Sequence, residues 1–534
     1  MGNFLCDCNR SSNQTQKRHV KTNSFEATIE TEIKTKLTYP SSRIIKSQPT
    51  FTKESTLNEF WTNLEQSSII NKGQGNPEEK YEFIEIIGKG SFGTVHKVKN
   101  KKTGELRAIK IIPKQTKGIL IEKKIITEIE LLEQIDHPNI IKLYEFYDLE
   151  DKICIVSELG NGGPLSKYKG SPKMTSELEI AIIMFQLLSA INYCHNQNLM
   201  HRDIKPDNIL VENKQQQGHF HIKLIDFGTA KMYLNSEQTQ VIGSAHFIAP
   251  EVLLGNYTHK CDLWSCGVVL YYLLTTKYPF DAKNKNDIYT KIKKCNYDRL
   301  EGNQYKKISP EAKDLVHKLI KSDFNERLSA QKALEHVWFK KLKVKEKLYD
   351  LGVNQMKELL NNIFTFNMEK TLQIPVINYL VHNNLEGSSY VNYASILFSK
   401  IDINNDGSLN KNEFIQNMNM IFTEFDTEID KKFLIEVFDK IDVDKSNKIG
   451  YREFVCAAVD RKELLKDNML KEAFEFFDKD KNGSISLEEI KKAFSKTQGY
   501  NHNDFNEILK QIDLNNDAVI DFAEFKAMMK AILG

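Results

Sequence analysis

Four polar side chains within a short stretch of this sequence could together carry out phosphoryl transfer. Asp203, Lys205 and Asn208 lie within one segment that reads HRDIKPDN, and Asp226 opens a DFG segment downstream. In that order they would accept the proton of an attacking hydroxyl, stabilise phosphate oxygens and supply two magnesium ligands. The sequence therefore predicts a phosphotransferase that uses magnesium.

A glycine-rich segment upstream could hold the phosphates of a nucleotide. Residues 88–95 read GKGSFGTV, which alone fits a dinucleotide fingerprint, a kinase phosphate loop or an accidental turn. A dinucleotide loop must open a helix, whereas residues 94–98 alternate like a strand that folds back as a hairpin. We therefore expect backbone amides here to close over ATP. The predicted nucleotide contacts are Gly88, Lys89, Gly90, Ser91, Phe92, Gly93, Val95, Ala108, Lys110, Asn208 and Asp226.

Two ion pairs should hold the phosphotransfer residues in place. Lys110 would bind the α- and β-phosphates and pair with Glu128 on the next helix, with Glu130 as the alternative because sequence alone does not fix the helix rotation. Glu251 follows an Ala-Pro pair that closes the activation segment, and Arg327 is its expected buried partner.

Four twelve-residue segments near the C-terminus each begin with Asp and end with Glu, and they recur about every 35 to 40 residues. A calcium loop needs oxygen ligands at positions 1, 3, 5, 7 and 9, a bidentate Glu at position 12, and a residue that permits a sharp turn at position 6. The predicted calcium ligands are Asp402, Asn404, Asp406, Ser408 and Glu413 in loop one; Asp442, Asp444, Ser446, Lys448 and Glu453 in loop two; Asp478, Asp480, Asn482, Ser484 and Glu489 in loop three; and Asp513, Asn515, Asp517, Val519 and Glu524 in loop four.

The four loops are not equivalent. Loops one and three satisfy the pattern, so we expect the firmest calcium sites there. Loop two has Ser446 at position 5 and Asn447 at position 6, where Asn tolerates a left-handed backbone better than most residues. Loop four has Ala518 at position 6, at a cost on the order of 1 kcal/mol that its many carboxylates would offset. The alternative for loops two and four is an acidic turn without metal.

Composition describes an ordinary multidomain protein. The 534 residues exceed one hydrophobic core, and 74 Lys and Arg balance 72 Asp and Glu, which argues against a nucleic-acid-binding protein. The eight cysteines show no paired metal spacing, so a reducing, cytoplasmic compartment is expected. Gly2 fits N-myristoylation, and Cys6 and Cys8 could take palmitate, which together would attach the chain to a membrane. The alternative is a disordered tail that begins with Met-Gly.

The pattern along the chain divides it into four parts. Residues 1–76 are rich in polar residues and read as a disordered extension. Residues 81–339 begin with a strand hairpin and continue with longer helical periodicities. The connector, residues 340–385, contains an apolar stripe of Met356, Leu359, Leu360 and Ile363 at helical spacing, and Pro375 should interrupt a helix over residues 372–381. Residues 386–534 hold the four loops.

Residues 81–339 resemble eukaryotic protein kinases, and Lys205 two places after Asp203 is the pattern of the serine/threonine type. The resemblance places Glu158 at the hinge that contacts the nucleotide. The order of all parts resembles the calcium-dependent protein kinases of plants and protists. The resemblance implies a multidomain α+β bilobal kinase fold followed by an all-α calmodulin-like domain of four EF-hands. It also implies ATP, Mg²⁺ and Ca²⁺ as cofactors, protein Ser/Thr substrates, a monomer, and an inhibitory junction released by calcium. A calcium-binding scaffold or pseudokinase is the alternative.

Three departures from the kinase pattern have consequences. Ser157 stands where many kinases have a bulky gatekeeper, which predicts a deep pocket behind the adenine site. Pro164 stands where basophilic kinases commonly have a glutamate, so the resemblance does not establish a preference for an upstream Arg. Ser244 replaces a common Thr and should keep the contact to Asp203. Ser236 and Thr239 are candidate phosphorylation sites, although exposed hydroxyls are common in loops.

Overall fold

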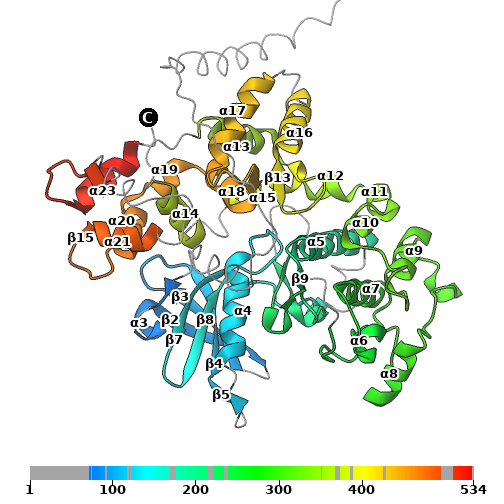
Figure 1. Cartoon of the computed structure of the whole chain (residues 1–534). Coiled ribbons are helices and arrows are strands. Elements are labelled where there is room, and N and C mark those ends of the chain that lie inside the picture. Colours follow the sequence, from blue (N-terminus) through cyan, green and yellow to red (C-terminus); the bar gives the residue numbers. More distant parts are fainter. Residues whose placement is uncertain are drawn as a thin grey trace, which may run out of the picture.

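Figure 1 shows the computed structural model of the chain, in which a small sheet and a larger group of helices are accompanied by a further helical body at the C-terminal end. We name these the sheet lobe (residues 71–157), the helical lobe (158–349) and the C-terminal module (353–531). Gly2, Cys6, Cys8, Ser91, Phe92 and Ser236, which carried predictions, lie outside the described residues. The structure describes residues 71–531 except 74, 91–92, 117–118, 121, 169–175, 213–219, 234–237, 350, 367–372, 385–388, 425–428, 495–508 and 511.

The sheet lobe is built on one six-stranded sheet with the order β1-β7-β8-β4-β3-β2. The predicted hairpin is present, because β2 pairs antiparallel with β3 and its register ends at the pair Gly90 and Gly93. Helix α4 (Glu122–Gln134) packs beside the sheet and carries the acidic partner of Lys110. The strands are β1 Asn71–Lys72, β2 Tyr81–Gly90, β3 Gly93–Asn100, β4 Leu106–Pro113, β5 Gln115–Thr116, β6 Ile119–Leu120, β7 Leu143–Asp148 and β8 Lys152–Ser157.

The sequence predicted a disordered extension up to residue 76, but the structure has a paired strand already at residues 71–72. Strand β1 pairs in parallel with the edge of β7, and the short helix α3 (Pro77–Lys80) follows it with a capping box at Asn76. Lys80 then forms a salt bridge of 3.1 Å with the buried Glu145 of β7. The polar composition of this segment gave no sign of these contacts. They depend on the unpaired backbone groups at the edge of a sheet, and this edge forms only in the folded protein.

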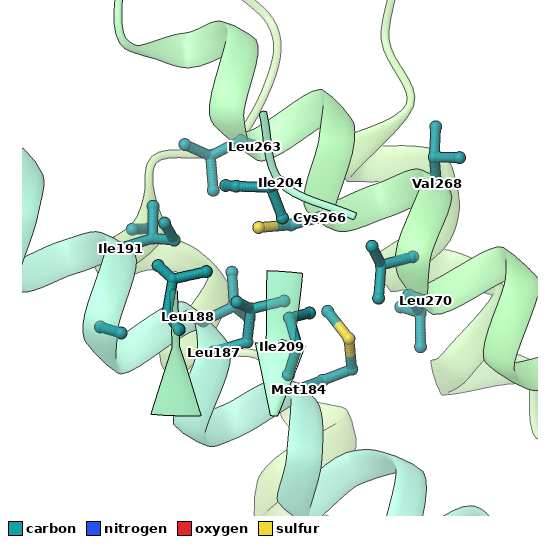
Figure 2. Packing of buried hydrophobic residues seen from close by; sticks show 14 of the residues in the cluster. Met184, Leu187, Leu188, Ile191, Ile204, Ile209, Leu263, Cys266, Val268 and Leu270 are labelled. Atoms are coloured by element: carbon teal, nitrogen blue, oxygen red, sulfur yellow. The ribbon is translucent and has the colours of Figure 1, made fainter. Parts of the chain in front are cut away.

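The core of the helical lobe lies between α5 (Glu177–Asn196) and α7 (Lys260–Thr275). Figure 2 shows apolar side chains from α5 facing those from α7, with Ile204 and Ile209 of the intervening chain between them. In the described part of the chain, α5 is the one helix long and apolar enough to span a membrane, and 89% of that window is buried inside the molecule. Other helices and strands of the helical lobe are β9 Leu199–Met200, β10 Ile209–Glu212, β11 His221–Leu224, β12 Lys231–Met232, α6 Pro250–Leu254, α8 Lys285–Lys293, α9 Pro310–Leu319, α10 Ala330–Leu334 and α11 Val337–Lys341.

The connector divides between two hydrophobic cores. Helix α12 (Val344–Leu348) packs on α5, and Val344 and Tyr349 are buried in the core of the helical lobe. Helices α13 (Val353–Phe364) and α14 (Gln373–Asn384) belong instead to the core of the C-terminal module. The kinase-like region therefore extends structurally about ten residues beyond residue 339, and the connector is not one structural unit.

The apolar stripe of α13 is fully used in packing. All four of its predicted members are buried in the C-terminal module, where α13 contacts α15 and α18. We expected Pro375 to interrupt a helix over residues 372–381, and this prediction is wrong. Pro375 lies in the first turn of α14, which continues beyond it. A proline is tolerated there, since the first N–H groups of a helix have no intrahelical acceptor.

The C-terminal module contains two pairs of helix-loop-helix units, which confirms the predicted fold class. Short strands join the loops of each pair: Leu409 lies opposite Ile449, and Ile485 lies opposite Ile520. These are the apolar residues at position 8 of each loop. The helices are α15 Ser389–Ile401, α16 Lys411–Thr423, α17 Lys431–Ile441, α18 Tyr451–Ala458, α19 Arg461–Leu464, α20 Asp467–Phe477, α21 Leu487–Phe494 and α23 Phe522–Lys530, and the strands are β13 Ser408–Asn410, β14 Lys448–Gly450, β15 Ser484–Ser486 and β16 Val519–Asp521.

Candidate functional site

Lys110 lies between two carboxylates at the base of the cleft between the lobes. Its Nζ is 3.4 Å from Oε1 of Glu128 and 3.6 Å from Oδ1 of Asp226. Burial alone would lower the pKa of Lys110, but these two carboxylates outweigh it and raise the pKa, so the ammonium stays charged. Glu128 is buried whereas Glu130 is exposed, so the structure brings the first of the two candidate glutamates to the lysine.

Asp203 is held in place by three neighbours. Lys205 Nζ lies 2.6 Å from Asp203 Oδ2, and the Ser244 hydroxyl donates to Oδ1 at 2.8 Å. Asn208 Nδ2 donates to the backbone carbonyl of Asp203 at 2.8 Å. Burial opposes ionisation of Asp203, but the hydrogen bonds from Lys205 and Ser244 hold its pKa below the ordinary value. The carboxylate is therefore ionised and able to accept a hydroxyl proton.

Sequence reasoning missed Asp262, which fixes the backbone before Asp203. This fully buried carboxylate accepts the backbone N–H groups of His201 at 3.0 Å and Arg202 at 2.8 Å. His195 lies 3.0 Å from it, and these contacts outweigh burial and lower the pKa of Asp262. Arg202 adopts a left-handed backbone with φ of 68°. The available signal was a single carboxylate inside the otherwise apolar helix α7.

The activation segment is fastened at its far end and along its length. Arg327 Nη2 donates to Glu251 Oε2 at 3.0 Å, and both side chains are buried, so the predicted pair forms. Arg202 donates to the hydroxyl of Tyr257 at 3.2 Å. Thr239, one of the two candidate phosphorylation sites, is exposed.

The cleft between the lobes has a volume of about 950 Å³, in the range of small-molecule sites. The carboxylate of Glu158 forms an ion pair of 3.0 Å with Lys223, and its backbone N–H donates to the carbonyl of Lys142 at 2.9 Å. Gly90 is the last residue of β2 and pairs with Gly93, the first residue of β3. The predicted phosphate-binding lysine and the two predicted magnesium-binding side chains meet in this cleft, so its residues fit ATP with magnesium. The predicted contacts that line the cleft are Gly88, Lys89, Gly93, Val95, Ala108, Lys110, Glu158, Asn208 and Asp226.

Loop one has the backbone of a calcium site. The N–H of Gly407 donates to Asp402 Oδ2 at 2.9 Å, and the N–H of Asp406 donates to Asn404 Oδ1 at 2.7 Å. Glu413 Oε1 accepts the N–H of Ile403 at 3.0 Å, which draws the last ligand back over the first turn. These bonds gather the oxygens that calcium would need from positions 1, 3, 5 and 12.

The other loops share this framework, and all twenty predicted ligands lie within the described part of the chain. The backbone at position 6 is left-handed in every loop, with φ of 62° at Asn447 and 67° at Ala518. The expected strain at Ala518 is therefore present. In two loops, ligand oxygens of three carboxylates lie within 4.8 Å of one another: Asp442, Asp444 and Glu453 in loop two, and Asp478, Asp480 and Glu489 in loop three.

The electrostatics of loops one and two fit a cation. Burial, together with neighbouring carboxylates, raises the pKa of Asp402 to about 7. Burial and the nearby Asp444 likewise raise the pKa of Glu453 to about 7. Negative charge is thus unfavourable at these oxygens unless a cation compensates it. Ca²⁺, which takes carboxylate, amide and carbonyl oxygens, suits this donor set.

The C-terminal module contacts the back of the sheet lobe through α14 and α18. His382 Nε2 donates to the backbone carbonyl of Leu143 at 3.0 Å, and its ring lies edge-on to Tyr144. Arg452 of α18 lies 3.6 Å from Asp136, which follows α4. The module is therefore seated on the sheet lobe, and no described residue of the module lines the cleft.

Comparisons with known proteins identify both the phosphotransfer region and the calcium-loop region. A family described as protein kinase domain matches residues 81–339, and one described as EF-hand domain pair matches residues 394–459 and 467–530. Calcium-dependent protein kinase 4 of Plasmodium berghei (strain Anka) is 37% identical over 460 residues, which are 84% of this chain and 86% of that protein. Calcium-dependent protein kinase 5 of Plasmodium falciparum (isolate 3D7) is 36% identical over 469 residues, 86% and 79% of the two chains. The chain therefore belongs to the calcium-dependent protein kinase family.

Proposed function

We propose that this protein is a calcium-activated kinase that transfers the γ-phosphate of ATP to serine and threonine hydroxyls of other proteins. One observation carries the proposal: a complete phosphotransfer site and four calcium loops share one chain, and the connector helices α13 and α14 are packed inside the calcium-binding module. The kinase and its calcium sensor are thus physically continuous.

The residues of the cleft divide the reaction among them. Asp203 accepts the proton of the substrate hydroxyl as its oxygen bonds to the γ-phosphorus, and the bond from that phosphorus to the bridging oxygen breaks to release ADP. Lys110 holds the α- and β-phosphates, with Glu128 keeping its ammonium in place. Lys205 neutralises the oxygens of the transferred group. Asn208 and Asp226 would hold magnesium, which supplies charge stabilisation on the phosphates.

The position of the connector supports release by calcium. The residues that line the cleft all lie between 85 and 244, so no described connector residue reaches it. Instead the apolar face of α13 lies in the C-terminal module, as an amphipathic helix lies in an opened EF-hand groove. This arrangement is what we expect of the released state, in which calcium holds the junction away from the substrate.

Transfer of radiolabelled phosphate from ATP to a mixed Ser/Thr/Tyr peptide library tests the reaction. We expect labelling of serine and threonine that rises with calcium and is abolished in Asp203→Ala. Calcium binding by that variant serves as the folding control, because the loops are remote from Asp203. Calcium binding without any transfer by the wild type would instead identify a calcium-binding scaffold built on a pseudokinase.

We also propose that the chain is a monomeric cytoplasmic protein that reaches membranes through its N-terminus. The support is the sequence alone: Gly2 follows Met1, and Cys6 and Cys8 are close enough to supply a second acyl chain. Mass spectrometry of the N-terminal peptide should find a myristoyl group that is absent from Gly2→Ala. An unmodified peptide from the native source would refute acylation.

A further inference from the structure

We propose that helix α5 of the helical lobe forms the outer wall of calcium loop one, residues 402–413, so that docking of this loop on the kinase and its filling by calcium strengthen each other. This deepens the proposed function and rests on it, since calcium must regulate the chain for the coupling to matter. In this proposal, calcium binding at one of the four loops is coupled directly to a contact with the kinase.

The first contact is a pair of hydrogen bonds from the kinase to the loop backbone. Asn192 lies on α5 and is only 5% exposed. Its Nδ2 donates to the backbone carbonyl of Asn405 at 2.6 Å and lies 3.4 Å from that of Asn404. Asn404 is itself a predicted ligand, and Asn405 follows it at position 4 with a left-handed backbone, φ of 53°. The kinase therefore holds the strained turn of the loop from outside.

The second contact is between Tyr193 and the turn at position 6. A Cβ atom placed on Gly407 would lie 2.2 Å from Cδ2 of Tyr193, so the aromatic ring rests on the glycine backbone. The same glycine has φ of 80°. The hydroxyl of Tyr193 accepts the backbone N–H of Asp136 at 2.9 Å, which fixes the ring. Glycine at this position serves both the turn and the close approach of the kinase.

The third contact comes from helix α12. Lys345 Nζ donates to the backbone carbonyl of Ile403 at 3.3 Å and lies over the ring of Phe185 on α5. Ile396 of α15, the helix that enters loop one, is buried in the hydrophobic core of the helical lobe. Carbonyls at positions 2, 3 and 4 of the loop thus all face donors of the kinase.

Loop one alone is covered in this way among the four loops, all of which lie in the described part of the chain. Its residues at positions 4 and 6, Asn405 and Gly407, are buried. The corresponding residues of the other loops are all exposed: Lys445, Asn447, Lys481, Gly483, Asn516 and Ala518. Among the four loops, only loop one therefore has its turn covered by the kinase, so only its conformation can directly affect this contact.

Physical linkage makes this contact reciprocal. Docking brings the apolar rings of Tyr193 and Tyr349 and the single ammonium of Lys345 towards a loop that carries three carboxylates. One ammonium does not balance three carboxylates, so part of the negative charge of an empty loop is desolvated without compensation, which is costly. A calcium ion neutralises most of that charge and orders the loop before it docks, so docking costs less when the loop is filled. By thermodynamic necessity, docking on α5 must then raise the calcium affinity of loop one.

Calcium titration of the full-length protein by isothermal calorimetry tests this coupling. We choose Asn192→Leu, which removes the donor without adding charge near the site, and Asn192→Ala as a second variant. Each should weaken calcium binding at one site by about fivefold or more, the range expected for allosteric coupling. Asn196→Leu, an exposed position later on the same helix, is the matched control and should bind calcium as the wild type does.

A double-mutant comparison locates the effect. Glu413→Gln removes the last ligand of loop one, so adding Asn192→Leu to it should change calcium binding no further. Unchanged affinity in Asn192→Leu, an equal loss in Asn196→Leu, or a further loss in the Glu413→Gln background would each overturn the proposal. If wild-type transfer does not respond to calcium, the proposed function fails instead, and this outcome is measured separately from binding.

Discussion

Single residues at position 6 set the calcium loops apart. Gly407 and Gly483 occupy left-handed backbone without strain, whereas Asn447 and Ala518 hold the same conformation with a side chain. The structure keeps the hydrogen bond from position 6 to the first aspartate even in loop four, where the N–H of Ala518 donates to Asp513 at 2.9 Å. The framework is thus intact, and the strain is local.

Replacing Ala518 by Gly should strengthen calcium binding at loop four. Relief of the left-handed strain is worth about 1 kcal/mol, or about fivefold in affinity. The mirror-image control is Gly483→Ala in loop three, where an added Cβ would meet no atom within 4 Å and only the strain is introduced. Calorimetry should show gains and losses of similar size. A gain in Ala518→Gly without a loss in Gly483→Ala would contradict this account.

Ser157 should admit bulky inhibitors behind the adenine site. Its small side chain lines the cleft at the end of β8, together with the apolar Ile155 and Leu132. Ser157→Met would fill that space, so the potency of an ATP-competitive inhibitor with a bulky substituent should fall by about tenfold or more. Inhibition curves at matched ATP saturation measure this. Equal potency against both proteins would show that no deeper pocket exists.

At the scale of elements, the connector joins two cores. Helix α12 completes the helical lobe, while α13 and α14 complete the C-terminal module. The junction should therefore be cut after Leu351 rather than near residue 340, because an earlier cut would strip Val344 and Tyr349 from the kinase core. The physical boundary of the kinase lies where the packing partner changes.

A chain truncated after Leu351 should have kinase activity that no longer depends on calcium. It keeps the phosphotransfer site and loses the connector helices α13 and α14 and the calcium loops. Peptide phosphorylation should proceed at the same rate in calcium and in chelator, with the full-length protein assayed alongside. A truncated chain that still responds to calcium would place the regulatory site inside the kinase domain.

Helix α14 gives the docking of the module a pH dependence. Burial drives the pKa of His382 well below 6.5, and Lys142, Arg452 and Arg107 around it act in the same direction. The undocked side chain has the higher pKa, so the undocked state takes up the proton as pH falls. Docking should be complete above about pH 7 and weaken as pH drops below the ordinary histidine pKa of about 6.5.

Hydrogen exchange of β7 amides at saturating calcium measures this docking. Protection should fall between pH 7 and pH 5.5 in the wild type, after correction for intrinsic exchange. His382→Gln keeps a donor for the Leu143 carbonyl but does not titrate, so its protection should stay constant over that range. An identical loss in both proteins would assign the pH dependence to other groups.

The sequence predicted the site residues and calcium loops better than the contacts between segments that are distant in the chain. The cleft residues were found because phosphoryl transfer requires those side chains in that order, and the loops because calcium requires oxygens at fixed positions. Glu128 could not be separated from Glu130 until the rotation of α4 was known. Asp262 and His382 bind backbone groups that are distant in the sequence, those of Arg202 and Leu143, and no local pattern signals such contacts.

At the scale of the whole molecule, the C-terminal module touches both lobes of the kinase. His382 meets the sheet lobe at β7, and loop one meets the helical lobe at Asn192. The connector helices lie inside the module rather than in the cleft. A ligand that favours this arrangement over one with a blocked cleft would shift the population towards active enzyme. Calcium is that ligand in our account.

The initial rate of peptide phosphorylation as a function of free calcium tests this account most directly. The wild type should be nearly inactive in chelator and rise steeply as calcium is added. Glu413→Gln combined with Glu489→Gln should remain near the chelator rate at calcium levels that saturate the wild type. Equal wild-type rates in chelator and in calcium would contradict the account, because the kinase would then be independent of its own sensor.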